Sequence, residues 1–312
     1  MVGSVRTEIN GNSASLSLVN AALVFAIPAT AYAVLTLGHF YLLGGFSGDS
    51  GYLAYVLWHN DWLLRAPRVW SEWSYYQIHA TPIFVPLTGL SWLLPFSRVQ
   101  FYAIVVGVSH ASLAVPIYWV LIRRWGGRRC WQAALLALAF AFNGLAIACG
   151  RNPHFEPLLV GFAMMFLVAL TAERSAIAKV AFLACVATRE DAGFHLFAVL
   201  AVWVVVDRLL VRPLSWGDRR VRYALAAFLC SIAALCVQKF VVGGSNSFSR
   251  VYVGDPLYAH LTWNSVSERI AYILVARPYL VLPPLAAAAW AIARRDPFPV
   301  LGFVAYGPWI AL

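Results

Sequence analysis

Long apolar runs separated by short polar segments fill most of the chain. The first run extends from Leu18 to Leu43, after a polar N-terminal stretch. Further runs follow at Val99–Ile122, Trp131–Cys149, Pro157–Thr171, Ser175–Ala187, Gly193–Leu210, Tyr223–Val242, Arg269–Ile292 and Pro297–Leu312. A spanning helix needs about 20 mostly apolar residues, and fewer when it is tilted or shielded by protein. The pattern predicts an all-α integral membrane protein, a polytopic helical bundle of about nine spans.

We expect this bundle to be a single transmembrane domain that covers residues 1–312. Its first helix occupies residues 17–43, residues 44–98 form a long loop with interfacial helices, and residues 99–312 hold the remaining spans. Because the chain ends inside its last apolar run, we also expect that the last spans are truncated at the C-terminus.

The predicted loop 44–98 is rich in Trp, which marks a membrane–water interface. Within it, Gly51–Leu64 is amphipathic enough to lie on the membrane surface as a helix. The run Pro82–Phe96 is ambiguous, because it contains three prolines and is short for a span.

The positions of the basic residues decide how this run is read. If Pro82–Phe96 spans, the basic cluster Arg123–Arg129 lies outside, against the positive-inside rule. If it is interfacial, that cluster and the basic segments at 173–179, 207–222 and 294–296 all lie inside. We therefore expect a cytoplasmic N-terminus and extracytoplasmic loops at residues 44–98, 150–156, 188–192 and 243–268. Abundant Ala and the preference for Arg over Lys are typical of a GC-rich bacterial genome, so we expect the protein in a bacterial inner (plasma) membrane.

Composition agrees with this placement. The chain is 62% hydrophobic and 12% charged, far more apolar than a soluble domain. A net charge of +10 raises the question of nucleic acid binding, but the positive-inside rule already explains the excess, so no nucleic acid partner is expected. The five cysteines are scattered and show no metal-ligand spacing.

The candidate chemistry lies in the predicted outside loops, which carry eight of the thirteen acids. Asp49 stands between glycines just after the first helix. A carboxylate there can take a proton from a hydroxyl as a general base, or can simply cap a helix or turn. Both interpretations remain open for Asp49.

Two later loops combine acids with basic side chains. The sequence Arg151-Asn-Pro-His154-Phe-Glu156-Pro forms a rigid bend, and Thr-Arg189-Glu190-Asp191 lies at a helix–helix junction. An ordinary solvated turn and a capped junction are the structural alternatives. Arg binds phosphate through paired donors, so these loops are suited to a lipid phosphate that meets a polar acceptor.

The order of these motifs resembles a bacterial family of predicted membrane proteins of unknown function. That family is placed in the GT-C superfamily of polyprenyl-phosphate-sugar glycosyltransferases. The resemblance covers roughly residues 48–210 and rests on Gly-Asp49, His79-x-x-Pro, a span ending in Arg-Arg, Asn-Pro-His154-Phe-Glu156-Pro and Thr-Arg189-Glu190-Asp191. Two departures concern the order of His-Phe-Glu-Pro, where the family has Phe-His-Pro-Glu, and Arg189, which replaces a Lys.

The resemblance implies a GT-C-like glycosyltransferase that moves a sugar from a polyprenyl-phosphate donor to an unknown extracytoplasmic acceptor. It implies catalytic roles for Asp49 and Glu156. It implies substrate-binding roles for His79, Arg151, His154, Arg189, Glu190 and Asp191. Some superfamily members use a divalent metal, so a metal is possible here, although no ligand spacing requires one.

Two other classes of function remain open. Lys239 and Arg277 fall within or near predicted spans, and charge inside a membrane can mark the substrate path of a secondary transporter. A non-catalytic scaffold or partner subunit fits the abrupt C-terminus.

Overall fold

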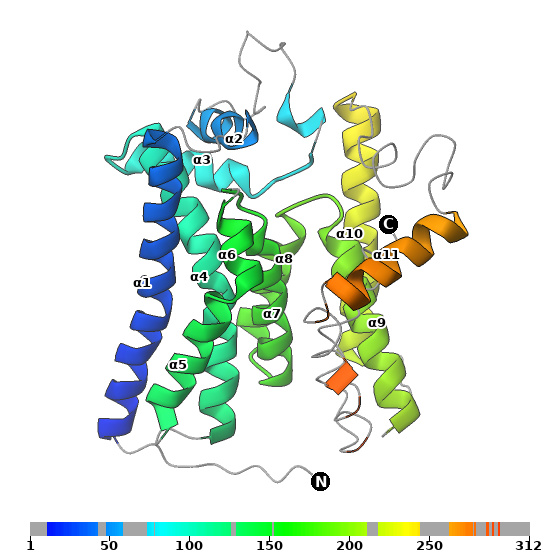
Figure 1. Cartoon of the computed structure of the whole chain (residues 1–312). Coiled ribbons are helices and arrows are strands. Elements are labelled where there is room, and N and C mark those ends of the chain that lie inside the picture. Colours follow the sequence, from blue (N-terminus) through cyan, green and yellow to red (C-terminus); the bar gives the residue numbers. More distant parts are fainter. Residues whose placement is uncertain are drawn as a thin grey trace. The chain divides into compact units, whose positions relative to one another are not determined.

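The computed structural model shows an all-helical protein (Figure 1). It describes residues 11–42, 48–58, 74–77, 79–125, 129–151, 153–210, 218–243 and 262–276, with five isolated positions between 278 and 293. No β-strand is assigned within these ranges. The predicted helical class is therefore confirmed for the described chain. The predicted span Pro297–Leu312, and the part of Arg269–Ile292 beyond residue 276 apart from those isolated positions, lie outside the described residues.

The chain divides into two compact units. Unit 1 comprises Met1–Tyr75 and Thr81–Arg189, and unit 2 comprises Tyr76–Ala80 and Glu190–Leu312. A five-residue segment of the first loop therefore belongs to unit 2, whereas the chain on both sides of it belongs to unit 1. Each unit is described by itself below.

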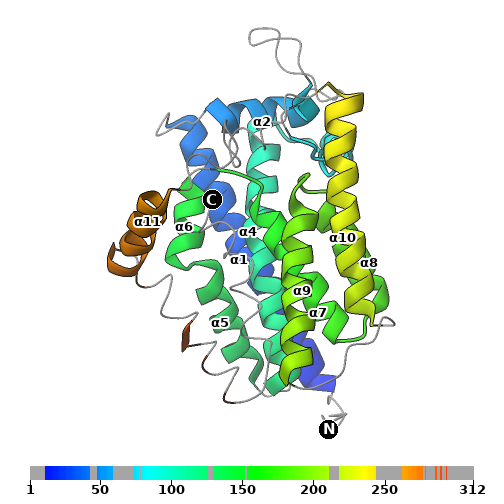
Figure 2. The same cartoon turned by 90° about the vertical axis from the view of Figure 1, so that its right-hand side faces the viewer.

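Unit 1 contains eight α-helices among its described residues. They are α1 (Gly11–Tyr41), α2 (Gly48–Trp58), α3 (Phe84–Leu93), α4 (Arg98–Trp125), α5 (Cys130–Ala141), α6 (Gly144–Arg151), α7 (Pro157–Thr171) and α8 (Ser175–Val186). α4 packs against α1, α5 and α7, and α7 packs against α8. Figure 1 shows α2 and α3 lying across one end of the long helices rather than beside them, and Figure 2 shows the same for α2.

This end of unit 1, which we call the loop end, joins several segments that are distant in sequence. The Phe40 ring near the end of α1 lies edge-on to Tyr102 near the start of α4, at 6.1 Å. The Arg98 guanidinium at the start of α4 lies over the Tyr55 ring of α2, and the Ile83 N–H before α3 donates to the Ala187 carbonyl after α8. The basic last turn of α4, with Arg123 and Arg124, is therefore at the opposite end.

α3 has ten residues, a length of about 15 Å, which is half of the hydrocarbon thickness that a span must cross. Its shortness agrees with the expectation that Pro82–Phe96 does not span. One face is buried through Phe84, Thr88 and Ser91, whereas Trp92 and Leu93 are exposed. Placement of α3 in a membrane interface stays a prediction.

The predicted single helix Trp131–Cys149 is wrong, because the structure divides it into α5 and α6. Asn143 makes the break: its side-chain Nδ2 donates to the Phe140 carbonyl at 2.6 Å, and its Oδ1 accepts from the Ala146 N–H at 3.0 Å. The side chain thus satisfies a carbonyl at the end of α5 and an N–H at the start of α6. Asn-Gly is a turn signal in sequence, so Asn143-Gly144 is the feature that could have predicted the break.

Small residues allow the long helices of unit 1 to approach closely. A Cβ placed on Gly107 of α4 would collide with the Ala29 carbonyl oxygen of α1, and one on Gly161 of α7 would collide with the Ser112 side chain of α4. Close backbone approach at glycine is typical of helix pairs in membranes.

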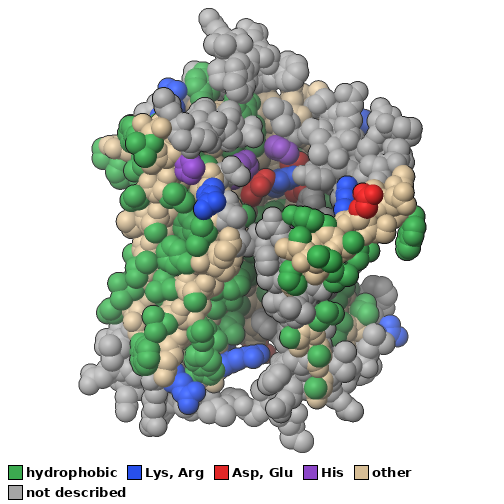
Figure 3. Space-filling view, in the orientation of Figure 1, with side chains coloured by type: hydrophobic (Ala, Val, Ile, Leu, Met, Phe, Trp, Pro, Cys, Tyr) green, Lys and Arg blue, Asp and Glu red, His purple; other side chains and the backbone are tan. Residues whose placement is uncertain are grey.

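Three described helices are long and apolar enough to cross a membrane, namely Ser17–Tyr41, Arg98–Trp125 and Arg219–Val241. α3, α5, α7 and α8 are shorter apolar helices. Val34, Leu135 and Val180 of unit 1 are 60%, 56% and 69% exposed, and Figure 3 shows hydrophobic side chains covering its visible flank. Such faces fit the predicted membrane protein, whereas nine spans and a GT-C architecture stay predictions.

Unit 2 is built on the helix pair α9 (Ala192–Leu210) and α10 (Arg219–Cys236), and α10 continues as the π-helical turn η3 (Val237–Val241). The short 3-10 helix η1 (Tyr75–Gln77) leads into its first-loop segment. At one end of the pair, Arg220 binds Asp207 of α9 at 2.8 Å and Asp218 at 2.5 Å. At the other end, Gly193 of α9 lies against Ala227 and Ser231 of α10. The helix α11 (Trp263–Ala276) follows, with no buried residue.

Candidate functional site

Glu156, Arg189 and His154 form a polar group at the loop end of unit 1. Arg189 Nη1 donates to Glu156 Oε1 at 2.6 Å, and His154 Nδ1 lies 3.6 Å from Glu156 Oε2. Glu156 is 43% exposed and Arg189 is 12% exposed, so the carboxylate reaches solvent while the guanidinium is largely enclosed. The structure thus brings together three of the predicted site residues from two loops.

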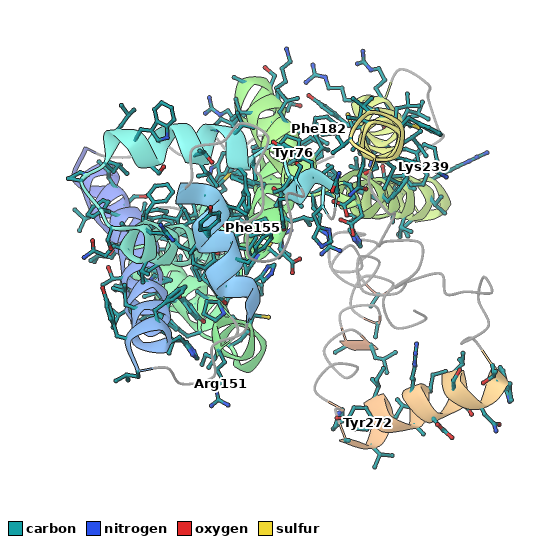
Figure 4. The ribbon with its side chains drawn as sticks, turned by 90° about the horizontal axis from the view of Figure 1, so that it is seen from above. Tyr76, Arg151, Phe155, Phe182, Lys239 and Tyr272 are labelled. Atoms are coloured by element: carbon teal, nitrogen blue, oxygen red, sulfur yellow. The ribbon has the colours of Figure 1, made fainter. Side chains whose placement is uncertain are left out.

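The loop that carries His154 and Glu156 is held firmly by the surrounding helices. The Pro153 carbonyl accepts hydrogen bonds from Ser50 Oγ of α2 at 3.1 Å and from Tyr102 Oη of α4 at 2.9 Å. Phe155 is 1% exposed and packs edge-on against Phe84 of α3 at 4.6 Å. Figure 4 shows Phe155 directed into the helices of unit 1. Contacts from α2, α3 and α4 therefore fix the position of this loop, while Glu156 remains accessible.

Sequence reasoning did not identify Ser50 and Tyr102 as contributors to the site. Tyr102 lies inside a predicted span and Ser50 directly precedes the predicted interfacial helix Gly51–Leu64, and a buried hydroxyl usually finds a partner. That rule gives the signal, but the partner itself, a carbonyl 51 residues away from Tyr102, follows only from the fold.

Asp49 is the second residue of α2, and its neighbour Ser50 holds the Pro153 carbonyl. The backbone at Asp49 therefore belongs to the same loop end as Glu156. Its side chain, and with it the separation of the two carboxylates, lies outside the described residues. The first turn of a helix is where the helix dipole favours a carboxylate, so the position of Asp49 fits both a functional and a structural role.

Arg151 was expected to bind substrate beside His154 and Glu156. It ends α6 and is exposed, and Figure 4 shows its side chain at the edge of unit 1, directed away from the helices. In the described structure it is Arg189, from the later loop, that meets Glu156.

His79 and Glu190 form a pair inside unit 2. Glu190 is 1% exposed, and its two carboxylate oxygens have different partners. Oε1 lies 2.9 Å from His79 Nδ1, and Oε2 accepts from the Ala80 N–H at 3.0 Å. Gln77 adds a bond from Nε2 to the Val242 carbonyl at 3.2 Å. These contacts fasten the first-loop segment to the α9–α10 pair.

Asp191 precedes α9 and is 3% exposed at its side chain. Its carbonyl accepts from the N–H groups of Phe194 and His195, and its Oδ2 lies 3.7 Å from His195 Nε2. Sequence reasoning missed His195. The spacing from Asp191 to His195, one helical turn, is the signal that predicts such a pair.

Among the described His, Cys, Asp and Glu residues, no group of three or more is arranged to hold a metal ion. The divalent metal that the resemblance allows thus has no assembled ligand set in the described part of the chain. Of the two residues that suggested a transport path, Lys239 is exposed in η3 beside Phe240, and Arg277 lies outside the described residues.

The chain was also compared with known proteins. No family model matches it, and neither a curated protein nor a solved structure matches it. The geometry of the candidate site therefore carries the functional argument.

Proposed function

We propose that this protein is a membrane glycosyltransferase of GT-C type, which uses a polyprenyl-phosphate sugar as donor. The observation that carries the proposal is the Arg189–Glu156 pair on a tethered loop at the loop end of unit 1. A guanidinium beside a solvent-reaching carboxylate supplies, in one place, a phosphate ligand and a group that can bind sugar hydroxyls.

The surroundings of this pair suit a lipid-linked substrate. Exposed Trp92 and Leu93 of α3 lie at the same end of unit 1, where a polyprenyl chain would enter from the membrane. We place this end on the extracytoplasmic side, because the basic last turn of α4 is at the opposite end.

In the proposed reaction the acceptor hydroxyl loses its proton, and its oxygen attacks the anomeric carbon. The bond from that carbon to the phosphate oxygen breaks, and the electron pair leaves with the lipid phosphate. Arg189 neutralises the charge that develops on the phosphate, while Glu156 and His154 orient the sugar. Asp49 is the sequence-based choice for the proton acceptor.

The first test measures binding of undecaprenyl phosphate, which carries the phosphate and lipid without any sugar. We expect the dissociation constant of the full chain in lipid nanodiscs to rise at least about tenfold in Arg189→Ala, the loss of about one charge-assisted contact. Glu173→Gln is the matched control, because Glu173 is exposed between α7 and α8, at the opposite end of unit 1.

The second test offers labelled undecaprenyl-phosphate sugars together with a cell-envelope extract as acceptor. Loss of label from the lipid fraction should require the wild-type chain and should fall in Glu156→Gln but not in Glu173→Gln. Equal binding and equal transfer in Arg189→Ala and the wild type would refute the proposal. Solute uptake into vesicles without donor consumption would favour a transporter instead.

A further inference from the structure

Two exposed arginines at the loop end of unit 1 have no acidic partner among the described residues. Arg98 begins α4 and Arg151 ends α6. Of the acids in unit 1 whose side chains are described, Glu156 is paired with Arg189, and Glu173 lies at the opposite end. Neither Arg98 nor Arg151 forms an ion pair within the described part of the chain, although a guanidinium favours an anionic partner.

Helix stability accounts for the position of Arg151 but not for that of Arg98. The dipole of a helix favours a cation at its last turn, where Arg151 lies, and disfavours one at its first turn. The start of α4 is also capped without Arg98. The Ser97 N–H donates to Gln100 Oε1 at 2.9 Å, and the Gln100 N–H donates to Ser97 Oγ at 3.3 Å. The Arg98 guanidinium lies over the Tyr55 ring, 5.2 Å from its centre. A negative charge outside the chain would offset the unfavourable position of Arg98.

Exposed apolar side chains lie next to both arginines. Trp92 and Leu93 end α3, shortly before Arg98. Ile147 lies one helical turn before Arg151 on the same face of α6, and Figure 4 shows the Arg151 side chain directed away from the helices. Arginines beside apolar surface reach for headgroup phosphates while their neighbours contact acyl chains. Each arginine thus has the surroundings that an amphiphilic anion requires.

The length of α4 places these arginines at the level of lipid headgroups. At 1.5 Å per residue, Arg98 and Arg123 lie about 38 Å apart along the helix axis. A bilayer with its headgroups is about 40–45 Å thick, so the two can reach the phosphates of opposite leaflets. Tyr102, one turn after Arg98, donates to the Pro153 carbonyl. Because Pro153 follows Arg151 by two residues, Arg151 lies near the same level as Arg98.

We propose that Arg98 and Arg151 bind the phosphates of anionic phospholipids in one leaflet, while the apolar side chains beside them contact the acyl chains. The two arginines then mark the plane in which the headgroups meet the loop end of unit 1. Binding consists of charge-assisted hydrogen bonds and apolar contact, without a covalent step. It is independent of sugar transfer, because neither arginine is paired with Glu156 in the described structure.

The test uses phosphatidylglycerol that carries a photoreactive diazirine on its acyl chain, present in trace amounts around the full chain in phosphatidylcholine nanodiscs. After illumination, mass spectrometry should find labelled peptides at Trp92 or Leu93 of α3 and at Ile147 of α6. Replacing the surrounding phosphatidylcholine by unlabelled phosphatidylglycerol should suppress this labelling, because only the anionic lipid competes for the arginines.

The two arginines serve as controls for one another. An arginine near an anionic headgroup contributes enough binding free energy for about a fivefold change in affinity. Arg98→Gln should therefore reduce the labelling of α3 about fivefold and leave that of α6 unchanged, and Arg151→Gln should do the reverse. Both side chains are exposed, so the variants should keep the wild-type melting temperature. Arg98→Lys keeps the charge and should retain most of the labelling of α3, which separates loss of charge from the changed contact with Tyr55.

Three results would overturn the lipid assignment: unchanged labelling in both glutamine variants, equal labelling in the two surrounding lipids, or absence of label from α3 and α6. Suppression by undecaprenyl phosphate at concentrations at which phosphatidylglycerol has no effect would also overturn it, because the surface would then belong to the donor substrate. A chain that fails to transfer sugar but shows the expected labelling would refute the proposed function alone.

Discussion

The contact between α1 and α4 predicts opposite effects for one substitution at two glycines. Gly107 of α4 faces the backbone of α1, where an added Cβ would meet the Ala29 carbonyl oxygen and would lie 3.1 Å from both the Ala29 carbonyl carbon and the Ala33 Cβ. Gly38 of α1 has nothing within 4 Å of the same position. Gly107→Ala should therefore destabilise the protein, whereas Gly38→Ala should not.

The magnitude follows from two opposing terms. Replacing glycine by alanine inside a helix contributes up to about 1 kcal/mol of stability through helix propensity. Gly38→Ala gains this term without a collision. Gly107→Ala gains it too, but the atom it strikes is backbone, so α1 as a whole must move, and overpacking of this kind costs about 1–3 kcal/mol. The helix-propensity contribution is the same in both variants, so the difference between their free energies of unfolding measures only the cost of the close approach at Gly107.

The assay is thermal unfolding of both variants and the wild type in the same lipid nanodiscs. At roughly 2 °C for each kcal/mol in a chain of this size, Gly107→Ala should melt about 2–6 °C below Gly38→Ala. Equal melting temperatures would show that α1 and α4 do not approach closely at Gly107. The packing described between these two helices would then be wrong.

Three further predictions concern single contacts. Tyr102→Phe removes one of the two donors to the Pro153 carbonyl and should cost about 0.5–1.5 kcal/mol in unfolding experiments, with no change of side-chain shape. Asn143→Ala removes the cap between α5 and α6 and should cost about 1 kcal/mol by the same measurement. The Arg220 hydrogen bond holds the pKa of the Asp218 carboxyl below its usual value, against an opposing effect of burial. This stabilisation is complete above the unfolded pKa and is lost as the pH falls through the folded pKa, so acid unfolding of Asp218→Asn should lack that contribution.

The helical class could be predicted from sequence because apolar runs of this length have few other solutions. The charge pattern led to the expectation that Pro82–Phe96 does not span, and the ten-residue length of α3 agrees with it, while the topology itself stays a prediction. Hydropathy alone could not reveal the break at Asn143, because a single polar residue barely changes the mean hydropathy of the surrounding stretch of residues. The break depends on two hydrogen bonds of a single side chain.

The candidate site was predictable in its residue types but not in its pairings. The sequence predicted Glu156, Arg189 and Glu190 in outside loops, yet nothing in their spacing says that Arg189 meets Glu156 while the adjacent Glu190 meets His79. Neighbouring residues of a turn point in different directions, so their partners are set by where the helices bring distant loops. Arg151, which is closer to Glu156 in sequence, is directed away from the helices for the same reason.

The two glutamates Glu156 and Glu190 differ in burial, and this difference predicts different consequences for their replacement. Glu190 gives both oxygens to the protein at 1% exposure, so Glu190→Ala orphans the buried Ala80 N–H and should cost at least about 1–3 kcal/mol of stability. Glu156 is 43% exposed, and the loop that carries it is anchored independently through Pro153 and Phe155. Glu156→Gln keeps an amide oxygen that can accept from Arg189, so this variant should stay within about 1 kcal/mol of the wild type while it impairs sugar transfer. Comparing thermal unfolding with sugar transfer for the two variants checks the assignment. A Glu156→Gln chain that unfolds as early as Glu190→Ala would make Glu156 a structural residue and would remove the geometric basis of the proposed site.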